Sequence, residues 1–382
     1  MLYPLPYLFF IAVLGVLALL VHQRKDDKQF CQYVTWSAIV IYVLFFGLRG
    51  FVAHDWMNYY PSFENTDWYD IANYQLGKSD EFGWILFQLL CKAIFDNFHF
   101  MVFVHSIICI FLLYNFIRRY TENICLVLIL YFAFDGFVLS LNLMRNVLSL
   151  LIFCNAIPYL INRKALQYYL MCILAFCFHY SSVVFFPLYF FMHLKNDKWV
   201  FGGISLFFVA VYFSNIPVFL TLFKLSGIGG AFVEKKVEAY TDLSSHLHVS
   251  IGLLERLLTL VLFFCYYDKL CGMRKENRLF LNAFLVYLFS AFLFSEFSEI
   301  SKRICILFDF CYWILWMDLI KCFYYRNNRI LFISFVSLYC LIKIAVPMIN
   351  QPVYQYDNFM FGDIKSYQER RYIFEKTFDE QN

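Results

Sequence analysis

The first long polar interruption in this chain is residues 48–84, LRGFVAHDWMNYYPSFENTDWYDIANYQLGKSDEFGW. It begins with Arg49 at the edge of an apolar run and ends with Asp80 and Glu81, before apolar residues resume. If the segment between them is helical, about three turns carry four further polar or aromatic candidates: His54, Asp55, Tyr59 and Tyr60. So dense a cluster of polar side chains in such an apolar chain indicates that the protein binds or acts on a polar group of a substrate beside the membrane.

The composition outside this stretch is that of a membrane protein. Of the 382 residues, 62% are hydrophobic and 15% are charged, whereas a soluble domain has about 25% charged residues. Apolar runs of roughly 17–20 residues recur, which is the length of a bilayer-spanning helix. They lack the two-residue alternation of a barrel strand. We therefore predict an all-α polytopic membrane protein with roughly 10–12 transmembrane helices.

Clusters of Lys and Arg between the apolar runs predict the loops that face the cytoplasm. The expected spans are residues 4–21, 30–48, 100–117, 124–140, 146–161, 199–220, 251–267, 279–294, 304–320 and 330–346. This arrangement gives a single multi-span domain over residues 1–346 and a C-terminal tail over residues 347–382. The large extracytoplasmic loops are about residues 49–81 and 221–250. The first run has no basic region or cleavage site, so it is expected to be an anchor and not a cleaved signal.

Two segments allow more than one interpretation. Residues 82–97 are short for a span and carry Gln88, Lys92 and Asp96, so we expect a re-entrant or interfacial helix. Residues 166–192 have basic residues at both ends, so we expect two short helices that turn near His179. One long tilted helix is the alternative, and it would invert the orientation of everything that follows.

Three residues are the candidates for catalysis. Arg145 interrupts the apolar stretch FVLSLNLMRNVLSLLIF and could clamp an anion with its planar guanidinium, or simply lie at an interfacial turn. His179, in AFCFHYSSVVFF, could act as a general base, although a lone histidine in an apolar segment is often a satisfied core residue. Asp55 is the best carboxylate of the first loop, and its alternative role is a helix N-cap.

Further residues are candidates for substrate binding because they lie on the same predicted face: Arg49, His54, Tyr59, Tyr60, Glu81, Glu296, Glu299 and Arg303. Glu296 and Glu299 are three positions apart and would share a helical face, or belong to a solvated turn. Arg303 begins a span, where an arginine often extends to the interface.

The sequence predicts no metal site and no cofactor. His246 and His248 could bind a metal, but two ligands in a loop are weak support. The 13 cysteines lie almost wholly inside apolar runs and are interpreted as small buried hydrophobes. Walker A, GxGxxG, HExxH and GxSxG patterns are absent from the sequence, and we expect no nucleic-acid partner. Any substrate must therefore already lie in or beside the bilayer.

An ordered set of motifs resembles the EpsG-like family of bacterial exopolysaccharide polymerases, which are Wzy-type membrane glycosyltransferases. The motifs are LRGFVAHDWMNYYPSF, EFGW, NLMRNVLSLLIF, FCFHYSSVVFFPLYF and SKRICILFDFCYW, and they span roughly residues 30–320. The family more often has a Gly-Thr or Thr-Asp pattern before the first aspartate, where this chain has Ala53-His54-Asp55.

The resemblance implies a multi-pass protein of the bacterial cytoplasmic membrane whose active site faces the extracytoplasmic side. A GT-C-like arrangement of its helices is one option that the resemblance offers. There it would transfer a growing glycan from undecaprenyl diphosphate to the acceptor sugar of another lipid-linked repeat unit, during exopolysaccharide or capsule synthesis. The implied partners are the undecaprenyl-diphosphate-linked oligosaccharide, the lipid bilayer, and flippase and chain-length regulator proteins.

Other classes of protein share some of these features. A flippase for lipid-linked oligosaccharides would also need many spans and internal basic residues, but such transporters usually show two similar halves, and no such repeat is visible here. A membrane acyltransferase is suggested only by the embedded His179. A scaffold of an export complex would need no catalytic residues at all.

Overall fold

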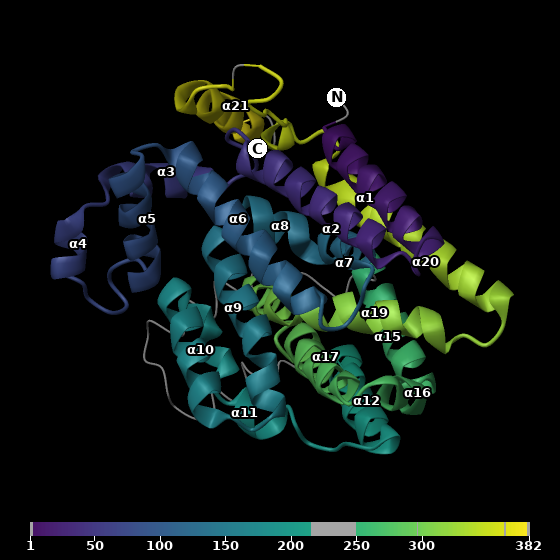
Figure 1. Cartoon of the computed structure of the whole chain (residues 1–382). Coiled ribbons are helices and arrows are strands. Elements are labelled where there is room, and N and C mark those ends of the chain that lie inside the picture. The colour runs from purple at the N-terminus through teal and green to yellow at the C-terminus, as the bar shows by residue number, and fades with distance from the viewer. Residues whose placement is uncertain (1–2, 215–249, 296, 363, 380–382) are drawn as a thin grey trace. The chain divides into compact units, whose positions relative to one another are not determined.

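The computed structural model describes residues 3–214, 250–295, 297–362 and 364–379 (Figure 1). Every regular element in these residues is a helix, and the one pairing of strand type is an isolated bridge between Arg49 and Asn358. The prediction of an all-α polytopic membrane protein is therefore confirmed. The chain forms two compact units, Met1–Phe186 with Ile330–Asn382 and Pro187–Arg329, and each is described by itself below.

The first unit contains the N-terminal helices and the C-terminal segment. Its elements before the first loop are α1 (Leu5–Gln23), α2 (Lys28–Tyr42) and the π-helical turn η1 (Val43–Gly47). The following elements are α3 (Trp56–Asn65), α4 (Trp68–Ala72), α5 (Phe82–Ile94), α6 (Phe98–Ile117), α7 (Ile124–Tyr131), η2 (Phe132–Gly136), α8 (Phe137–Leu141), α9 (Met144–Ile161), α10 (Ala165–Phe178) and η3 (Tyr180–Phe185). After the second unit come α20 (Arg326–Ala345), η5 (Val346–Met348), η6 (Pro352–Tyr354) and α21 (Tyr367–Asp379).

The second unit is a smaller group of helices. Its elements are α11 (Leu188–Phe191), α12 (Lys198–Ser214), α15 (Ile251–Cys265), α16 (Tyr267–Met273), α17 (Glu276–Leu293), α18 (Ser298–Cys305), η4 (Ile306–Phe308) and α19 (Phe310–Cys322). The predicted outer loop 221–250 lies outside the described residues except for its last position, as do His246 and His248.

Six helical segments among the described residues are long and apolar enough to cross a membrane. They are Leu5–Gln23, Lys28–Gly47, Phe98–Ile117, Ile124–Leu141, Met144–Ile161 and Arg326–Met348. Each coincides with a span expected from the sequence, which confirms a multi-pass protein. By contrast, α5 has 13 residues and is about 20 Å long, shorter than the roughly 30 Å hydrocarbon core. Its length agrees with the expected re-entrant or interfacial helix.

The long apolar segment 166–192 is broken into short helices at the predicted position. His179 has an extended backbone, with φ −159° and ψ 127°, and it ends α10. The 3-10 helix η3 begins at the next residue, and α11 follows after Pro187. The single tilted helix is thus excluded, and the break places the His179 side chain at a helix end.

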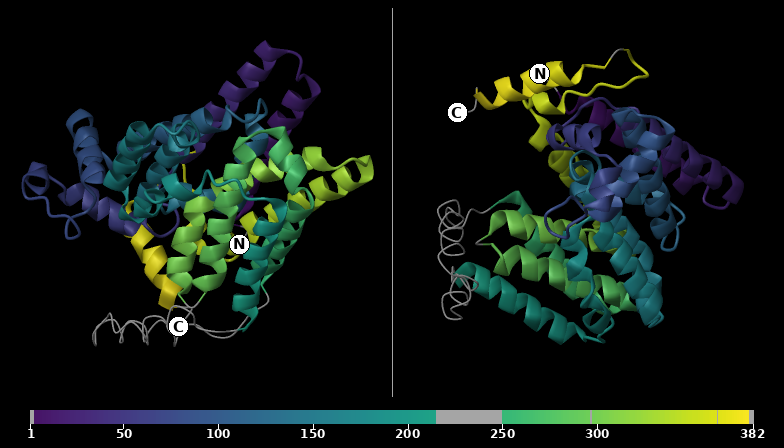
Figure 2. Two further views of the ribbon diagram at one scale, coloured as in Figure 1. Left: turned by 90° about the horizontal axis from the view of Figure 1, so that it is seen from below. Right: turned by 90° about the vertical axis from the view of Figure 1, so that its left-hand side faces the viewer.

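The C-terminal segment is bound to the start of the first loop, and both lie together in Figures 1 and 2. The last carbonyls of a helix lack intrahelical donors. Here the Tyr356 hydroxyl donates to the Phe45 carbonyl (2.7 Å), and the Asn358 amide donates to the Leu44 carbonyl (2.9 Å). The Phe359 backbone N–H also donates to the Leu48 carbonyl (3.0 Å). The tail and the first loop must therefore lie on the same side of the membrane.

Labelling of introduced cysteines can test this arrangement. In a background without the partly accessible Cys31, Cys177, Cys265 and Cys271, we expect Asn73→Cys and Phe361→Cys to react with an impermeant thiol reagent added outside intact cells. Lys164→Cys should react only after the cells are opened, because Lys164 follows the opposite end of α9. All three positions are exposed. Labelling of Lys164→Cys and Asn73→Cys from the same side would contradict the topology.

Candidate functional site

A buried carboxylate, Glu81, connects the start of α5 to two distant segments of the first unit. Glu81 immediately precedes α5, and only 3% of the residue is exposed. One of its oxygens, Oε2, lies 2.6 Å from Arg145 Nη1, and the other, Oε1, lies 2.6 Å from His179 Nδ1. The Tyr180 backbone N–H also donates to Oε1 at 3.3 Å. We call Asp80, Glu81, Arg145 and His179 the Glu81 cluster.

The first turn of α9 positions Arg145. Its Nη1 group bonds to Asp80 Oδ1 at 2.8 Å as well as to Glu81, and its guanidinium carbon lies 5.7 Å from the centre of the Tyr59 ring. A guanidinium at membrane depth is costly without an anionic partner, and here it has two. Both carboxylates meet the same nitrogen, and the Tyr59 side chain also hydrogen-bonds to the Arg145 side chain.

The bond to Glu81 fixes the orientation of the His179 ring. Because Nδ1 faces the carboxylate, the other ring nitrogen, Nε2, points away from it. In this arrangement Nδ1 donates its proton to Glu81, and Nε2 is the nitrogen that can accept one. A carboxylate on Nδ1 also stabilises the imidazolium that forms when Nε2 takes a proton. Glu81 and His179 therefore have the geometry of a general base with its orienting carboxylate.

A glycine allows Glu81 to approach His179 so closely. A Cβ atom on Gly83 would lie 2.8 Å from the carbonyl oxygen of Cys177, which is closer than real contacts permit. The first turn of α5 thus packs backbone against backbone on the last turn of α10. This contact brings the residue before α5 next to the residue that ends α10.

Neighbouring hydrogen bonds connect the first loop to the His-Tyr-Ser-Ser segment. The hydroxyls of Tyr74 and Tyr180 lie 2.9 Å apart, and the Ser181 hydroxyl donates to Asn146 Oδ1 at 3.2 Å. The Ser62 hydroxyl donates to Asp80 Oδ2 at 3.2 Å. The sequence did not single out Asp80, Asn146 or Tyr180 as site residues. Their only sequence signal is that each is adjacent to a predicted candidate.

Glu81 and the neighbouring Tyr59 have shifted pKa values with identifiable causes. Burial acts to raise the pKa of Glu81, but the hydrogen bond from His179 and the charge of Arg145 prevail and hold it below its ordinary 4.5. Burial raises the pKa of Tyr59 to about 12 although the charge of Arg145 opposes the shift. At neutral pH Glu81 is therefore ionised, and the Tyr59 hydroxyl keeps its proton.

The lowered pKa of Glu81 predicts a pH dependence of stability. Ionised Glu81 stabilises the folded chain above its ordinary pKa of 4.5, and this contribution is lost as the pH falls through the lowered folded-state value. We expect the Tm of the detergent-solubilised chain to fall more steeply between about pH 5 and pH 3 than that of Glu81→Gln. Exposed Glu64 gives the control, because Glu64→Gln should follow the unmodified chain. Parallel curves for the unmodified chain and Glu81→Gln would contradict this linkage.

The remaining candidates of the first loop lie at the start of α3. The backbone N–H groups of His54 and Asp55 face the Asn142 side-chain oxygen at 2.9 and 3.4 Å, and the Tyr59 N–H bonds to the Asp55 carbonyl. Asp55 stands at the N-cap of α3, but its side chain makes no capping hydrogen bond. Tyr59 contacts Arg145, and this contact ties Tyr59 to the Glu81 cluster. The predicted catalytic role of Asp55 remains a prediction.

Aromatic contacts with the C-terminal segment hold Tyr60 and His54. The Tyr60 ring stacks on Tyr367 at 4.7 Å, and the His54 ring meets the edges of Tyr354 and Phe374. Burial lowers the pKa of His54. These side chains attach the tail to the loop, and their predicted contact with substrate stays a prediction.

Arg49 is buried in the protein interior. Only 4% of the residue is exposed, and its Nη1 donates to the Phe46 carbonyl at 2.8 Å. Burial lowers the pKa of Arg49, while nearby Tyr42 and Tyr356 oppose the shift. These contacts give Arg49 a structural role at the end of η1, and its predicted role in substrate binding remains untested.

The second unit carries the other two described candidates on α18. Glu299 pairs with Lys302 at 3.0 Å, both largely exposed, and Arg303 is exposed on the same helix. Glu296 lies outside the described residues. Among the described residues, no group of three or more His, Cys, Asp or Glu side chains could hold a metal ion. The predictions of substrate binding at Glu299 and Arg303, and of no metal, are not decided by these facts.

Two charged residues of the second unit, one buried and one partly buried, were not predicted from the sequence. Glu255 and Arg256 are consecutive in α15, inside an expected span. Glu255 accepts a hydrogen bond from Thr259 at 2.7 Å, and Arg256 Nε donates to the Tyr287 hydroxyl at 3.0 Å. Two adjacent charges in an apolar run were a sequence signal that could have identified them.

The fold and the Glu81 cluster define a class: a multi-pass α-helical membrane protein with a buried carboxylate between an arginine and a histidine. The chain belongs to the EpsG family, whose model matches residues 32–359 of 382. This match confirms the resemblance seen in the motifs and connects the protein with exopolysaccharide production. No curated protein and no solved structure matches the chain.

Proposed function

We propose that this protein is an exopolysaccharide polymerase of the bacterial cytoplasmic membrane. It transfers a growing glycan from undecaprenyl diphosphate to the acceptor sugar of another lipid-linked repeat unit, on the extracytoplasmic face. The observation that carries this proposal is the shared carboxylate: Glu81 holds Arg145 on one oxygen and His179 on the other. An anion-binding group and a proton acceptor thus stand on opposite sides of one residue.

Arg145 stabilises the leaving group. When the bond between the anomeric carbon and the diphosphate oxygen breaks, its electron pair stays on the diphosphate, and negative charge builds there. A preorganised guanidinium stabilises such charge. The diphosphate replaces Asp80, which is the more exposed partner of Arg145 at 44% against 4% for the Glu81 side chain. Glu81 keeps Arg145 in place during this exchange.

His179 activates the acceptor. As the acceptor hydroxyl oxygen bonds to the anomeric carbon, its proton passes to Nε2 of His179. Glu81 stabilises the resulting imidazolium through Nδ1. The products are the elongated glycan on its own carrier and a free undecaprenyl diphosphate. The rings of Tyr59 and Tyr74 lie beside the cluster, and aromatic rings of this kind can stack on sugars.

The alternative function is that of a flippase, which moves the lipid-linked oligosaccharide across the membrane without polymerising it. Moving an oligosaccharide across the bilayer breaks no bond, so it needs no pair of base and orienting carboxylate. The His179–Glu81 pair and the EpsG family membership therefore favour glycosyl transfer.

The proposal can be tested in cells by measuring in which membrane leaflet the lipid-linked substrate accumulates when the protein is absent. A strain that lacks the protein should accumulate single lipid-linked repeat units that an impermeant oxidant of sugars can attack from outside. Reintroducing the unmodified chain should convert these units into polymer. If the units accumulate on the cytoplasmic leaflet, protected from the oxidant, the protein acts at or before translocation, and the flippase replaces the polymerase.

A further inference from the structure

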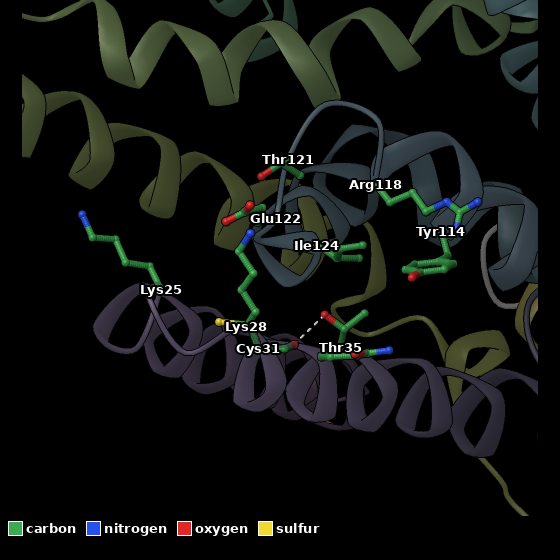
Figure 3. A pocket seen from close by; sticks show the side chains of 10 residues that line it. Lys25, Lys28, Cys31, Thr35, Tyr114, Arg118, Thr121, Glu122 and Ile124 are labelled. Atoms are coloured by element: carbon green, nitrogen blue, oxygen red, sulfur yellow. Dashed lines mark hydrogen bonds between the residues drawn. The ribbon is translucent and has the colours of Figure 1, made fainter.

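A polar pocket lies around the N-terminus of α2 and the C-terminus of α6, at the end of these helices that is opposite to the first loop (Figure 3). It has a volume of about 240 Å³, and Cys31, Gln32, Thr35, Thr121 and Ile124 are among its lining residues. The other end of α6 is Phe98, which stacks on Phe51 of the first loop. Since α6 has 20 residues and is about 30 Å long, the pocket lies one membrane thickness away from that loop.

Positive charge dominates the pocket. Its lining includes three cations, Lys25, Lys28 and Arg118, and one carboxylate, Glu122. Figure 3 shows Lys28 pointing across the pocket towards Glu122, whereas the Arg118 guanidinium lies 5.4 Å from the centre of the Tyr114 ring. The nearby Asp27 accepts a hydrogen bond from the Phe30 N–H as the N-cap of α2. The residues that line the pocket therefore carry two more positive than negative charges. The carboxylates of Asp26 and Asp27, which act on Cys31, reduce this excess, and Arg24, over the Phe30 ring, adds one more cation.

An aromatic strip extends from the pocket along the membrane-spanning part of α2 and α6. The Trp36 ring lies 5.9 Å from Tyr114, which lines the pocket, and 6.2 Å from Phe111, one turn further along α6. Trp36 is 41% exposed, Phe111 is 44% exposed, and Val40 continues the strip on α2. A cationic pocket at the membrane boundary thus adjoins an exposed apolar surface within the span.

We propose that this pocket binds the headgroup of an anionic phospholipid. The phosphate lies beside Lys28, which reaches into the pocket, with Lys25 and Arg118 to either side (Figure 3). One acyl chain runs along Trp36 and Phe111. A soluble phosphate compound would have no use for the aromatic strip, and a zwitterionic lipid would gain nothing from the excess positive charge. Basic residues near a membrane surface attract anionic lipids by about one kcal/mol each, which is roughly fivefold in affinity.

The test uses the purified full chain, with native mass spectrometry to measure the affinity of its tightest bound lipid. Phosphatidylglycerol should bind more tightly than phosphatidylcholine. The double substitution Lys28→Gln with Arg118→Gln should weaken phosphatidylglycerol binding by roughly 30-fold, because two charges are lost. Lys164→Gln is the matched control, since Lys164 is an exposed cation of the same unit outside this pocket, and it should bind like the unmodified chain.

Two further measurements do not depend on how the double variant folds. Raising the KCl concentration should weaken binding of phosphatidylglycerol to the unmodified chain but not binding of phosphatidylcholine. Trp36→Ala should weaken phosphatidylglycerol binding, and inorganic diphosphate should fail to displace the lipid. Equal affinities for the two lipids, or unchanged binding in the double variant, would overturn the proposal. Displacement by inorganic diphosphate would also overturn it, in favour of a soluble phosphate ligand.

Discussion

Replacing Arg145 with alanine is expected to lower polymer formation by about 10²–10³-fold, which is the cost of losing one preorganised electrostatic donor. The guanidinium is the cation of the Glu81 cluster, and it stands where the leaving diphosphate gains charge. Arg145→Lys keeps a charge but loses the planar fork, so it should restore only part of the activity. The measurement is polymer length and the amount of accumulated single lipid-linked units in a strain that carries only the variant.

Asp80→Asn is the matched control, because it removes an ion pair of Arg145 but keeps the guanidinium that would bind the diphosphate. Asp80→Asn removes one of the two carboxylates on Arg145 but leaves the buried contact with Glu81. We expect polymer formation within a fewfold of normal, because Asp80 is the partner that the diphosphate replaces. Both variants should reach normal protein levels in the membrane. Full-length polymer from Arg145→Ala would remove Arg145 from the active site.

Replacing His179 with glutamine should lower turnover by about 10²–10⁴-fold, the usual contribution of a general base. Glutamine can still donate a hydrogen bond to Glu81, so the packing of α5 against α10 should survive, but it cannot take up the acceptor's proton. The measurement is polymer length and the amount of accumulated single lipid-linked units, as for Arg145→Ala.

Tyr180→Phe provides the control for the His179 experiment. It removes a neighbouring hydroxyl that bonds to Tyr74 but leaves the ring and the backbone N–H that faces Glu81. Its turnover should stay within a fewfold of normal. If His179→Gln polymerises normally while Asp55→Asn does not, the base is the loop carboxylate Asp55, and His179 has a structural role.

Much of the fold could be predicted because membrane spans are local features of a sequence. A run of about 20 apolar residues must form a helix whose backbone groups bond to each other, wherever the rest of the chain lies. The break at His179 was also predictable, since basic residues at both ends of one apolar segment require an even number of crossings. These rules describe segments one at a time, and they do not say which segments touch.

The site was only partly predictable for the same reason. Glu81 and Arg145 are 64 positions apart, and Glu81 and His179 are 98 apart. Their positions at the edges of apolar segments, or inside them, suggested that all three were functional. Nothing in the local sequence indicated that the Glu81 carboxylate would contact both Arg145 and His179. The hydrogen bond that attaches the tail through Asn358 to Leu44, 314 positions away, could not be predicted from the sequence either. The close contact at Gly83 shows how one residue without a side chain decides such a pairing.

The polymerase activity can be tested with the purified protein in lipid nanodiscs and one synthetic substrate, an oligosaccharide repeat unit linked to undecaprenyl diphosphate. We predict a ladder of products that grow by one repeat unit at a time, with release of undecaprenyl diphosphate in equal amount. Arg145→Ala and His179→Gln should form little or no ladder under the same conditions, and Asp80→Asn should form one. If the unmodified chain leaves the substrate unchanged, or only moves it between leaflets, the proposed polymerase activity is wrong.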